Sequence, residues 1–324
     1  MTKVSCMPIN LLYEYTISHK ETNFYNLRRV SLPRKEKIMD FVIFTDSSCD
    51  LPTDKVAELG IKVLSLEVNI SDIGTRLNHE VDPKEIYAML REKKEMKTSA
   101  VNMERFKEAF EAELAAGRDV LYLGFSSGLS ATFMNGKNAC EELAEEYPER
   151  NVIAIDTLCA SLGQGLLVTL ACRKAAEGAT ILEVAEYVEQ TKLHLAHWFT
   201  IDDLFFLKRG GRVSAATAVL GSMLAIKPVL HVDDEGHLIN VSKARGRKAA
   251  IVELFNKMKE NAIDPASQTV YICHGDCYDD AKLLADMITE ELGVTDILVD
   301  YTGPVIGAHS GPGTLALFYV ATER

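Results

Sequence analysis

The pattern of hydrophobic and polar residues changes near residue 40 and again near residue 198. Between these points, short uninterrupted apolar runs alternate with longer segments in which apolar residues recur every three or four positions. The short runs are typical of strands buried on both faces, and the longer periodicity is typical of helices. The predicted strands are 40–46, 61–68, 120–125 and 152–156, and the predicted helices are 53–59, 82–91, 102–116, 130–147, 162–178 and 181–195. This alternation predicts a three-layer α/β/α domain with a parallel sheet over residues 40–197.

After residue 198 the order of elements is different, because several predicted strands follow one another without a helix between them. Strands are predicted at 199–206, 227–232, 238–243, 269–274 and 297–301, and helices at 246–261 and 278–291. The second and third of these strands flank Asp233-Asp234-Glu235-Gly236, a sequence typical of a hairpin turn. We therefore expect a second, two-layer α/β domain with a mixed sheet over residues 198–324.

Residues 1–39 have no clean periodicity and contain seven Lys and Arg against three Glu. They lack an uninterrupted apolar segment followed by small residues, which argues against a signal peptide. We expect a poorly ordered extension or a misassigned start, with Met39 as the natural first residue. The alternative is an organelle-type targeting peptide, which the three acidic residues (Glu14, Glu21 and Glu36) disfavour.

Composition and charge exclude some classes of function, but they add little to the prediction of the fold. The 324 residues are 47% hydrophobic and 25% charged, close to the average of folded domains. No apolar run approaches the roughly 18–20 residues that a membrane helix needs, so we expect at most transient membrane contact. The net charge is −12, and since residues 1–39 contribute +4, the rest of the chain carries −16. Because an acidic surface repels phosphate backbones, we expect no nucleic-acid partner.

Seven cysteines at irregular spacing are typical of a reduced cytoplasmic protein, in which cysteine acts as a small hydrophobic residue. Cys273, His274 and Cys277 lie close together in the sequence, but no second pair of metal-binding residues accompanies them. We therefore expect a cytoplasmic protein without a metal site or a cofactor.

One segment is compatible with two kinds of site, a hydrolase nucleophile or an anion-binding site. In it, Gly124, Ser126 and Gly128 fit the G-x-S-x-G pattern between a predicted strand and a predicted helix. This is the setting of a hydrolase nucleophile, although no glycine-rich oxyanion loop precedes it. The same geometry also suits anion binding, since the first amide groups of a helix are unpaired and carry its positive dipole end. The hydroxyls of Ser126 and Ser127 would add donors for a carboxylate or phosphate, and plain helix capping by Ser127 is the simplest alternative.

Three further segments contain candidate binding residues. Residues 208–212 form a predicted basic turn with Arg209 and Arg212, and arginine grips carboxylates with two parallel hydrogen bonds. Residues 306–314 form a predicted glycine-rich loop around His309, a candidate anion nest. The pair Thr98-Ser99 precedes a predicted helix and, taken alone, indicates a helix cap.

Together these segments resemble the DegV family of bacterial fatty-acid-binding proteins over about residues 40–321. The resemblance rests on six blocks in family order: Thr45–Leu51, Thr98-Ser99, Ser126–Thr132, Leu204–Arg212, Ile226–Leu230 and Gly307–Thr314. The sequence departs from the family at Ala100-Val101, where Gln-Pro is common, and residues 1–38 have no counterpart in the family pattern.

The resemblance implies two α/β domains that bury a long acyl chain. The resemblance also implies which residues bind the fatty acid carboxylate: Thr98, with its neighbour Ser99, and Ser126 or Ser127. His309 and one arginine, Arg209 or Arg212, would lie in or beside the same hydrogen-bond network. Members of the family present the fatty acid to a separate, ATP-using fatty acid kinase, which implies a carrier subunit without catalytic activity of its own. A serine acyl hydrolase using Ser126, and a binding module for another carboxylate or small lipid, remain the alternatives.

Overall fold

The structure is a computed structural model that describes residues 40–213 and 226–324, so the predicted extension at 1–39 lies outside the described residues. The described residues belong to one compact unit. The division at residue 197 between two domains therefore stays a prediction. The structure confirms the predicted fold class, with a parallel sheet followed by a mixed sheet.

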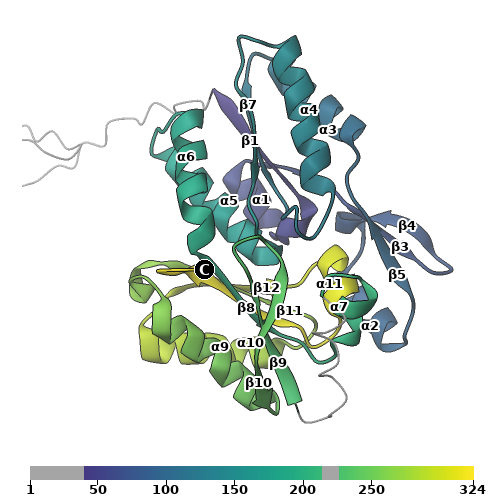
Figure 1. The fold of residues 1–324 in the computed structure, drawn as a ribbon, viewed down its shortest axis with the longest axis vertical. Coiled ribbons are helices and arrows are strands. Elements are labelled where there is room, and N and C mark those ends of the chain that lie inside the picture. Colours follow the sequence, from purple (N-terminus) through teal and green to yellow (C-terminus); the bar gives the residue numbers. More distant parts are fainter. Residues whose placement is uncertain (1–39, 214–225) are drawn as a thin grey trace, which may run out of the picture. The chain divides into compact units, whose positions relative to one another are not determined.

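The first sheet is parallel, in the order β2-β1-β6-β7. Its strands are β1 (Phe41–Asp46), β2 (Lys62–Leu64), β6 (Asp119–Gly124) and β7 (Val152–Asp156). The helices α3 (Met103–Ala115) and α4 (Thr132–Glu146) cover one face, and α5 (Ser161–Ala176) and α6 (Ile181–Thr191) cover the other (Figure 1). Successive residues of β1 contribute to opposite faces, with Ile43 packing toward α5 and Phe44 toward α3.

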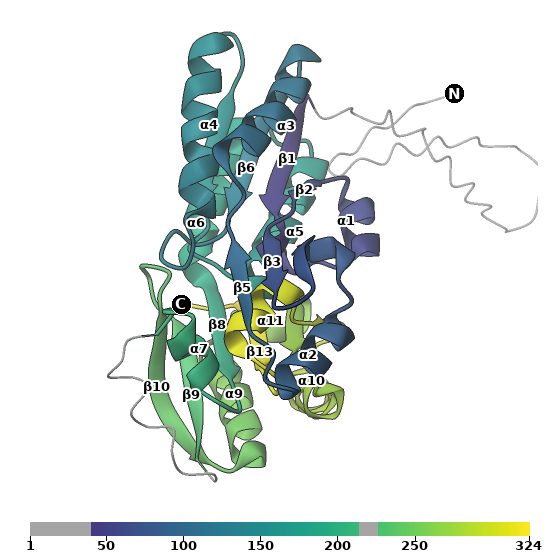
Figure 2. The same cartoon turned by 90° about the vertical axis from the view of Figure 1, so that its right-hand side faces the viewer.

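The second sheet is mixed, in the order β10-β9-β8-β13-β11-β12. Its strands are β8 (Leu195–Thr200), β9 (Ile226–Val232), β10 (Leu238–Arg245), β11 (Thr269–His274), β12 (Asp296–Tyr301) and β13 (Leu315–Val320). Only the β11–β12 pair is parallel among the described pairs. The helices α9 (Arg247–Asn261) and α10 (Tyr278–Leu292) pack on one face of this sheet (Figure 2).

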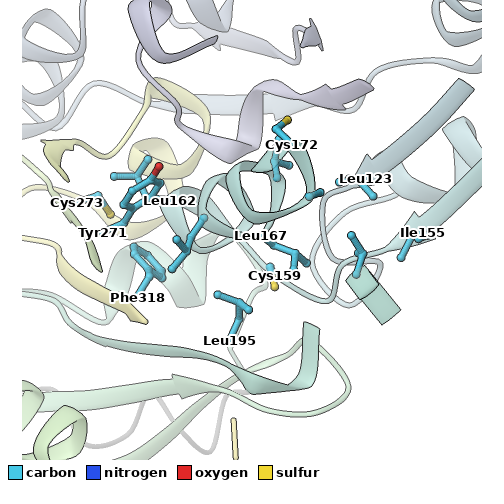
Figure 3. Close-up of a cluster of buried hydrophobic side chains, with 14 of the residues drawn as sticks. Leu123, Ile155, Cys159, Leu162, Leu167, Cys172, Leu195, Tyr271, Cys273 and Phe318 are labelled. Carbon is cyan, nitrogen blue, oxygen red and sulfur yellow. The ribbon is translucent and has the colours of Figure 1, made fainter. Parts of the chain in front are cut away.

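The helix α5 fills the space between the two sheets. Its side chains pack against Leu123 and Ile155 of the first sheet and against Tyr271 and Phe318 of the second (Figure 3). Because both sides of α5 are covered, its apolar residues surround the helix instead of forming one stripe. One hydrophobic core therefore runs through both sheets.

A third, small antiparallel sheet has the order β4-β3-β5 and lies next to α11 (Figure 2). Its strands are β3 (Glu67–Ile70), β4 (Gly74–Leu77) and β5 (Met96–Ser99). The helix α11 (Pro304–Ser310) contacts β3 and β5, and α2 (Pro83–Arg91) and α7 (Phe205–Arg209) contact α11. The short helix α1 (Thr53–Leu59) packs instead on the core cluster around α5. This sheet places Thr98, a predicted binding residue, opposite α11.

Several sequence predictions were wrong in detail. The pair Thr98-Ser99 does not cap a helix, since it lies in β5 and the N-cap of α3 is Asn102. The strand predicted at 61–68 is divided between β2 and β3, because the backbone leaves the first sheet at Leu66, whose amide donates to Ser47 Oγ at 2.9 Å. The strand predicted at 199–206 is β8 followed by the helix α7. The glycine-rich segment 306–314 is not a loop throughout, since α11 begins at Pro304 and extends to Ser310.

Candidate functional site

A cavity of about 240 Å³ lies among β5, α11, the start of α5 and the second sheet. Most of its wall is apolar, with Phe125, Phe199, Leu207, Leu238 and Phe318 among the lining residues. Polar side chains gather on part of the wall, and they come from segments that are far apart in the sequence. An apolar cavity with a few convergent polar groups is the usual form of a small-molecule site.

The first polar group joins Thr98 of β5 to His309 of α11, whose Oγ1 and Nε2 atoms lie 2.8 Å apart. Burial, with smaller contributions from the positive charges of Arg212 and Arg209, lowers the pKa of His309 to about 4. The imidazole is therefore neutral at pH 7. Gly210 packs closely against this ring, since a Cβ at that position would lie 2.3 Å from His309 Nδ1.

Arg212 places a positive charge on the cavity wall. Its Nε donates to the Leu129 carbonyl at 3.1 Å and its Nη1 donates to the Gly210 carbonyl at 2.5 Å. These two bonds fix the guanidinium, and burial lowers its pKa from the usual range, although arginine stays protonated at pH 7. No acidic side chain of the described residues forms a salt bridge with Arg212. A half-buried cation without an acidic partner favours an anionic ligand.

The start of α4 adds a polar group that sequence reasoning did not select. Ser130 and Ala131 line the cavity directly before the first residue of α4, Thr132. Ser130 Oγ accepts from the Thr132 amide at 3.2 Å and lies 2.9 Å from Thr132 Oγ1. The positive end of a 15-residue helix thus points toward the wall that Ser130 forms. The signal in the sequence was the start of the helix predicted at 130–147, which has Ser130 as its first residue.

The predicted binding residues divide into two groups. Thr98, Arg212 and His309 line the cavity, whereas Ser99, Ser126, Ser127 and Arg209 do not. Ser99, Ser127 and Arg209 are exposed, and the Arg209 guanidinium lies over the rings of Phe205 and Phe206. The roles of these four residues in ligand binding stay predictions.

Ser126 does not line the cavity, and its side chain makes structural hydrogen bonds. Its Oγ donates to the Gly236 carbonyl at 2.9 Å and accepts from the Gly128 amide at 3.2 Å, so it ties the turn between β9 and β10 to the segment after β6. The helix α4 begins only at Thr132, and the backbone after Ser126 first forms a turn. The expected cradle of helix amides at Ser126 is therefore not formed. No histidine or carboxylate of the described residues is bonded to Ser126, so the geometry offers it no general base.

A second polar group lies on the wall near the start of α5. Ser161 Oγ donates to Asp50 Oδ2 at 2.5 Å and lies 3.3 Å from Cys273 Sγ, and Thr302 Oγ1 donates to the same sulfur at 3.0 Å. Burial raises the pKa of Asp50 to about 7. Sequence reasoning missed this group, because its members come from four separate segments. The carboxyl of Asp50 disfavours a negatively charged ligand atom at this part of the wall. An anionic ligand would therefore be more favourable beside Thr98, Arg212 and His309.

The described residues show no group of three or more side chains suited to hold a metal ion. Among the same residues, no helix is both long and apolar enough to cross a membrane. The predicted cytoplasmic location stays a prediction.

Comparison with known proteins finds a family whose members resemble this chain over most of its length. Residues 40–322 match the family model described as "Uncharacterised protein, DegV family". A DegV domain-containing protein of Clostridium perfringens is 47% identical over 286 residues, covering 88% of this chain and 98% of that protein. The chain is similar to a solved DegV family protein of Thermus thermophilus, described by its fatty acid binding, with 32% identity, a TM-score of 0.77 and coverage of 87% and 100%. It is also similar to DegV of Bacillus subtilis, described as a fatty acid binding protein, with 26% identity, a TM-score of 0.74 and coverage of 88% and 100%.

The fold and the site define an α/β protein with a mostly apolar cavity. The match over residues 40–322 shows that the chain belongs to the DegV family. The resemblance read from six sequence blocks is thereby confirmed.

Proposed function

We propose that this protein binds a long-chain fatty acid in the cavity, with the carboxylate beside Thr98, Arg212 and His309. The observation that carries the proposal is the half-buried guanidinium of Arg212, which lines an apolar cavity and has no acidic partner among the described residues. Fatty acid binding by relatives that are 26% and 32% identical supports it.

The energetics agree with such a ligand. Each methylene moved from water into the apolar wall contributes about 0.8 kcal/mol, so a chain of sixteen carbons contributes on the order of 10 kcal/mol before ordering costs. The carboxylate cannot be buried without partners. Arg212 supplies the charge, Thr98 supplies a hydroxyl, and the neutral His309 fixes that hydroxyl at 2.8 Å. The start of α4 adds a favourable dipole.

We infer further that the protein presents the bound carboxylate to a separate fatty acid kinase. Thr98 and Ser130 are only half-buried, and the residues that follow them, Ser99 and Ala131, are exposed. The polar part of the cavity therefore lies close to the surface, where a phosphoryl donor can reach it. Arg209, also exposed, is then free to contact the partner instead of the lipid.

The first experiment is mass spectrometry of an organic extract of the purified protein, beside a native mass spectrum. We expect one fatty acid per chain.

Arg212→Ala should reduce fatty acid affinity at least tenfold, because a hydrogen bond from a charged donor to the carboxylate is lost. Arg209→Ala is the matched control and should keep the affinity of the native protein. Equal affinity of the two variants would refute the assignment of the head group to Arg212.

Kinase presentation needs its own test, with the purified lipid-loaded protein, ATP and a bacterial fatty acid kinase. We expect acyl phosphate only when both proteins are present.

Fluorophosphonate labelling tests the hydrolase alternative. Stoichiometric labelling that disappears in Ser126→Ala would support the hydrolase against the carrier.

A further inference from the structure

Ser310 is the unusual hydroxyl of the cavity wall. The other lining hydroxyls have partners inside the protein: Thr98 with His309, Ser130 with Thr132, Ser161 with Asp50, Thr302 with Cys273 and Thr314 with the Gly311 carbonyl. Ser310 lines the cavity and is 5% exposed, yet its Oγ has no hydrogen-bond partner among the described residues.

The position of Ser310 on α11 directs it toward the cavity. Val305, Ile306, His309 and Ser310 line the cavity and follow helical spacing, so they form one face of α11. Ser310 is adjacent to His309, which contacts Thr98 at the polar part of the wall. Thr302, eight residues earlier, belongs to the group around Asp50. Thr302 precedes the first residue of α11, Pro304, whereas His309 and Ser310 are its last two residues.

A buried hydroxyl without a partner is destabilising unless a ligand supplies one. An acyl chain has no acceptor to offer, whereas a carboxylate has two oxygens that accept several hydrogen bonds. We propose that Ser310 Oγ donates a hydrogen bond to the carboxylate of the bound fatty acid and makes the site selective for the free acid over its ester. This inference rests on the proposed function and names one more residue of the same site.

The proposal predicts opposite effects on the empty and the loaded protein. In Ser310→Ala the empty protein should be at least as stable as the native one, because an unpaired buried hydroxyl is removed. The loaded protein should bind palmitic acid about tenfold more weakly, since a hydrogen bond to a charged acceptor is lost. Affinity for methyl palmitate, which carries no charge, should change much less.

The test uses delipidated full-length protein, with calorimetric titration of palmitic acid and of methyl palmitate, and thermal unfolding without ligand. Ser310→Thr keeps the hydroxyl and should restore the preference for the acid. Thr302→Val is the matched control, because it removes a cavity hydroxyl that has a partner. It should lower the stability of the empty protein and leave the ratio of acid to ester affinity near that of the native protein.

Each outcome decides the proposal. If the native protein binds palmitic acid and Ser310→Ala binds it equally well, the inference about Ser310 fails and the proposed function stands. If Ser310→Ala destabilises the empty protein and weakens acid and ester alike, the hydroxyl is structural and the inference is wrong. If the native protein binds neither compound, the proposed function fails together with the inference.

Discussion

At the scale of single residues, His309 shows how burial sets the chemistry of the site. Desolvation lowers its pKa to about 4 from the ordinary value of 6.5, with smaller contributions from Arg212 and Arg209. A neutral imidazole leaves the positive charge of the site on Arg212 alone. It also forms one hydrogen bond with Thr98, whose Oγ1 lies 2.8 Å from His309 Nε2.

This shift predicts a pH dependence of stability. Between about pH 6.5 and 4 the unfolded chain binds a proton at His309 that the folded protein does not bind, so the free energy of unfolding falls as the pH falls. The loss due to His309 should reach about 3 kcal/mol near pH 4 and be absent above pH 7. Urea unfolding of the native protein and of His309→Gln at pH 4.5, 6 and 7.5 measures it.

The variant is needed because Asp50 acts in the opposite direction. Its pKa is raised to about 7, so the folded protein gains stability from protonated Asp50 below that pH. Asp50 is present in both proteins, and its contribution cancels in the difference. A difference between the two proteins that does not change with pH would contradict the low pKa of His309.

The sequence indicates binding residues whose side chains are distinctive by themselves. It does not indicate residues whose importance depends on a contact with a distant part of the chain. Arg212 and His309 were candidates because charge and imidazole are visible in the sequence. Ser161 and Ser310 were missed, since a serine becomes notable only through Asp50 at 2.5 Å or through the absence of a partner among the described residues. Neither property can be read from neighbours in the chain.

At the scale of elements, the G-x-S-x-G segment shows how one pattern supports different structures. Its serine joins the turn of the β9–β10 hairpin to the first sheet, through Ser126 Oγ and the Gly236 carbonyl at 2.9 Å. Gly236 has φ +78, and a Cβ there would lie 2.1 Å from Ser126 Oγ, so the turn needs glycine for both reasons. The sequence predicted the hairpin and the serine, but not that they meet.

Ser126→Ala tests whether this contact is structural. We expect the free energy of unfolding to fall by about 1–3 kcal/mol, because the buried Gly236 carbonyl loses its donor. Fatty acid affinity should stay near that of the native protein, since Ser126 does not line the cavity. Denaturant unfolding and calorimetric titration measure the two quantities. Weaker binding at unchanged stability would instead favour the carboxylate role that the sequence predicts for Ser126.

At the scale of the whole molecule, α5 links the two sheets. The sequence predicted this helix well, at 162–178 against the observed Ser161–Ala176. It did not reveal that both sides of the helix are covered, because an apolar helix has the same pattern whether one sheet or two sheets bury it. The division at residue 197 was drawn from the change in element order, and that change says nothing about a shared core.

A shared core predicts that the two sheets unfold together. Leu166 of α5 is fully buried in the cluster that joins them, so Leu166→Ala should lower the free energy of unfolding by about 2–5 kcal/mol. Trp198, the only tryptophan of the chain, lies in β8 and reports on the second sheet by fluorescence. Hydrogen exchange of the β6 amides reports on the first. Both probes should show one transition with the same midpoint, shifted equally by the variant, because α5 cannot lose its packing on one sheet while keeping its position on the other. A first sheet that unfolds at a lower denaturant concentration than the second would show that residues 40–197 form an independent domain.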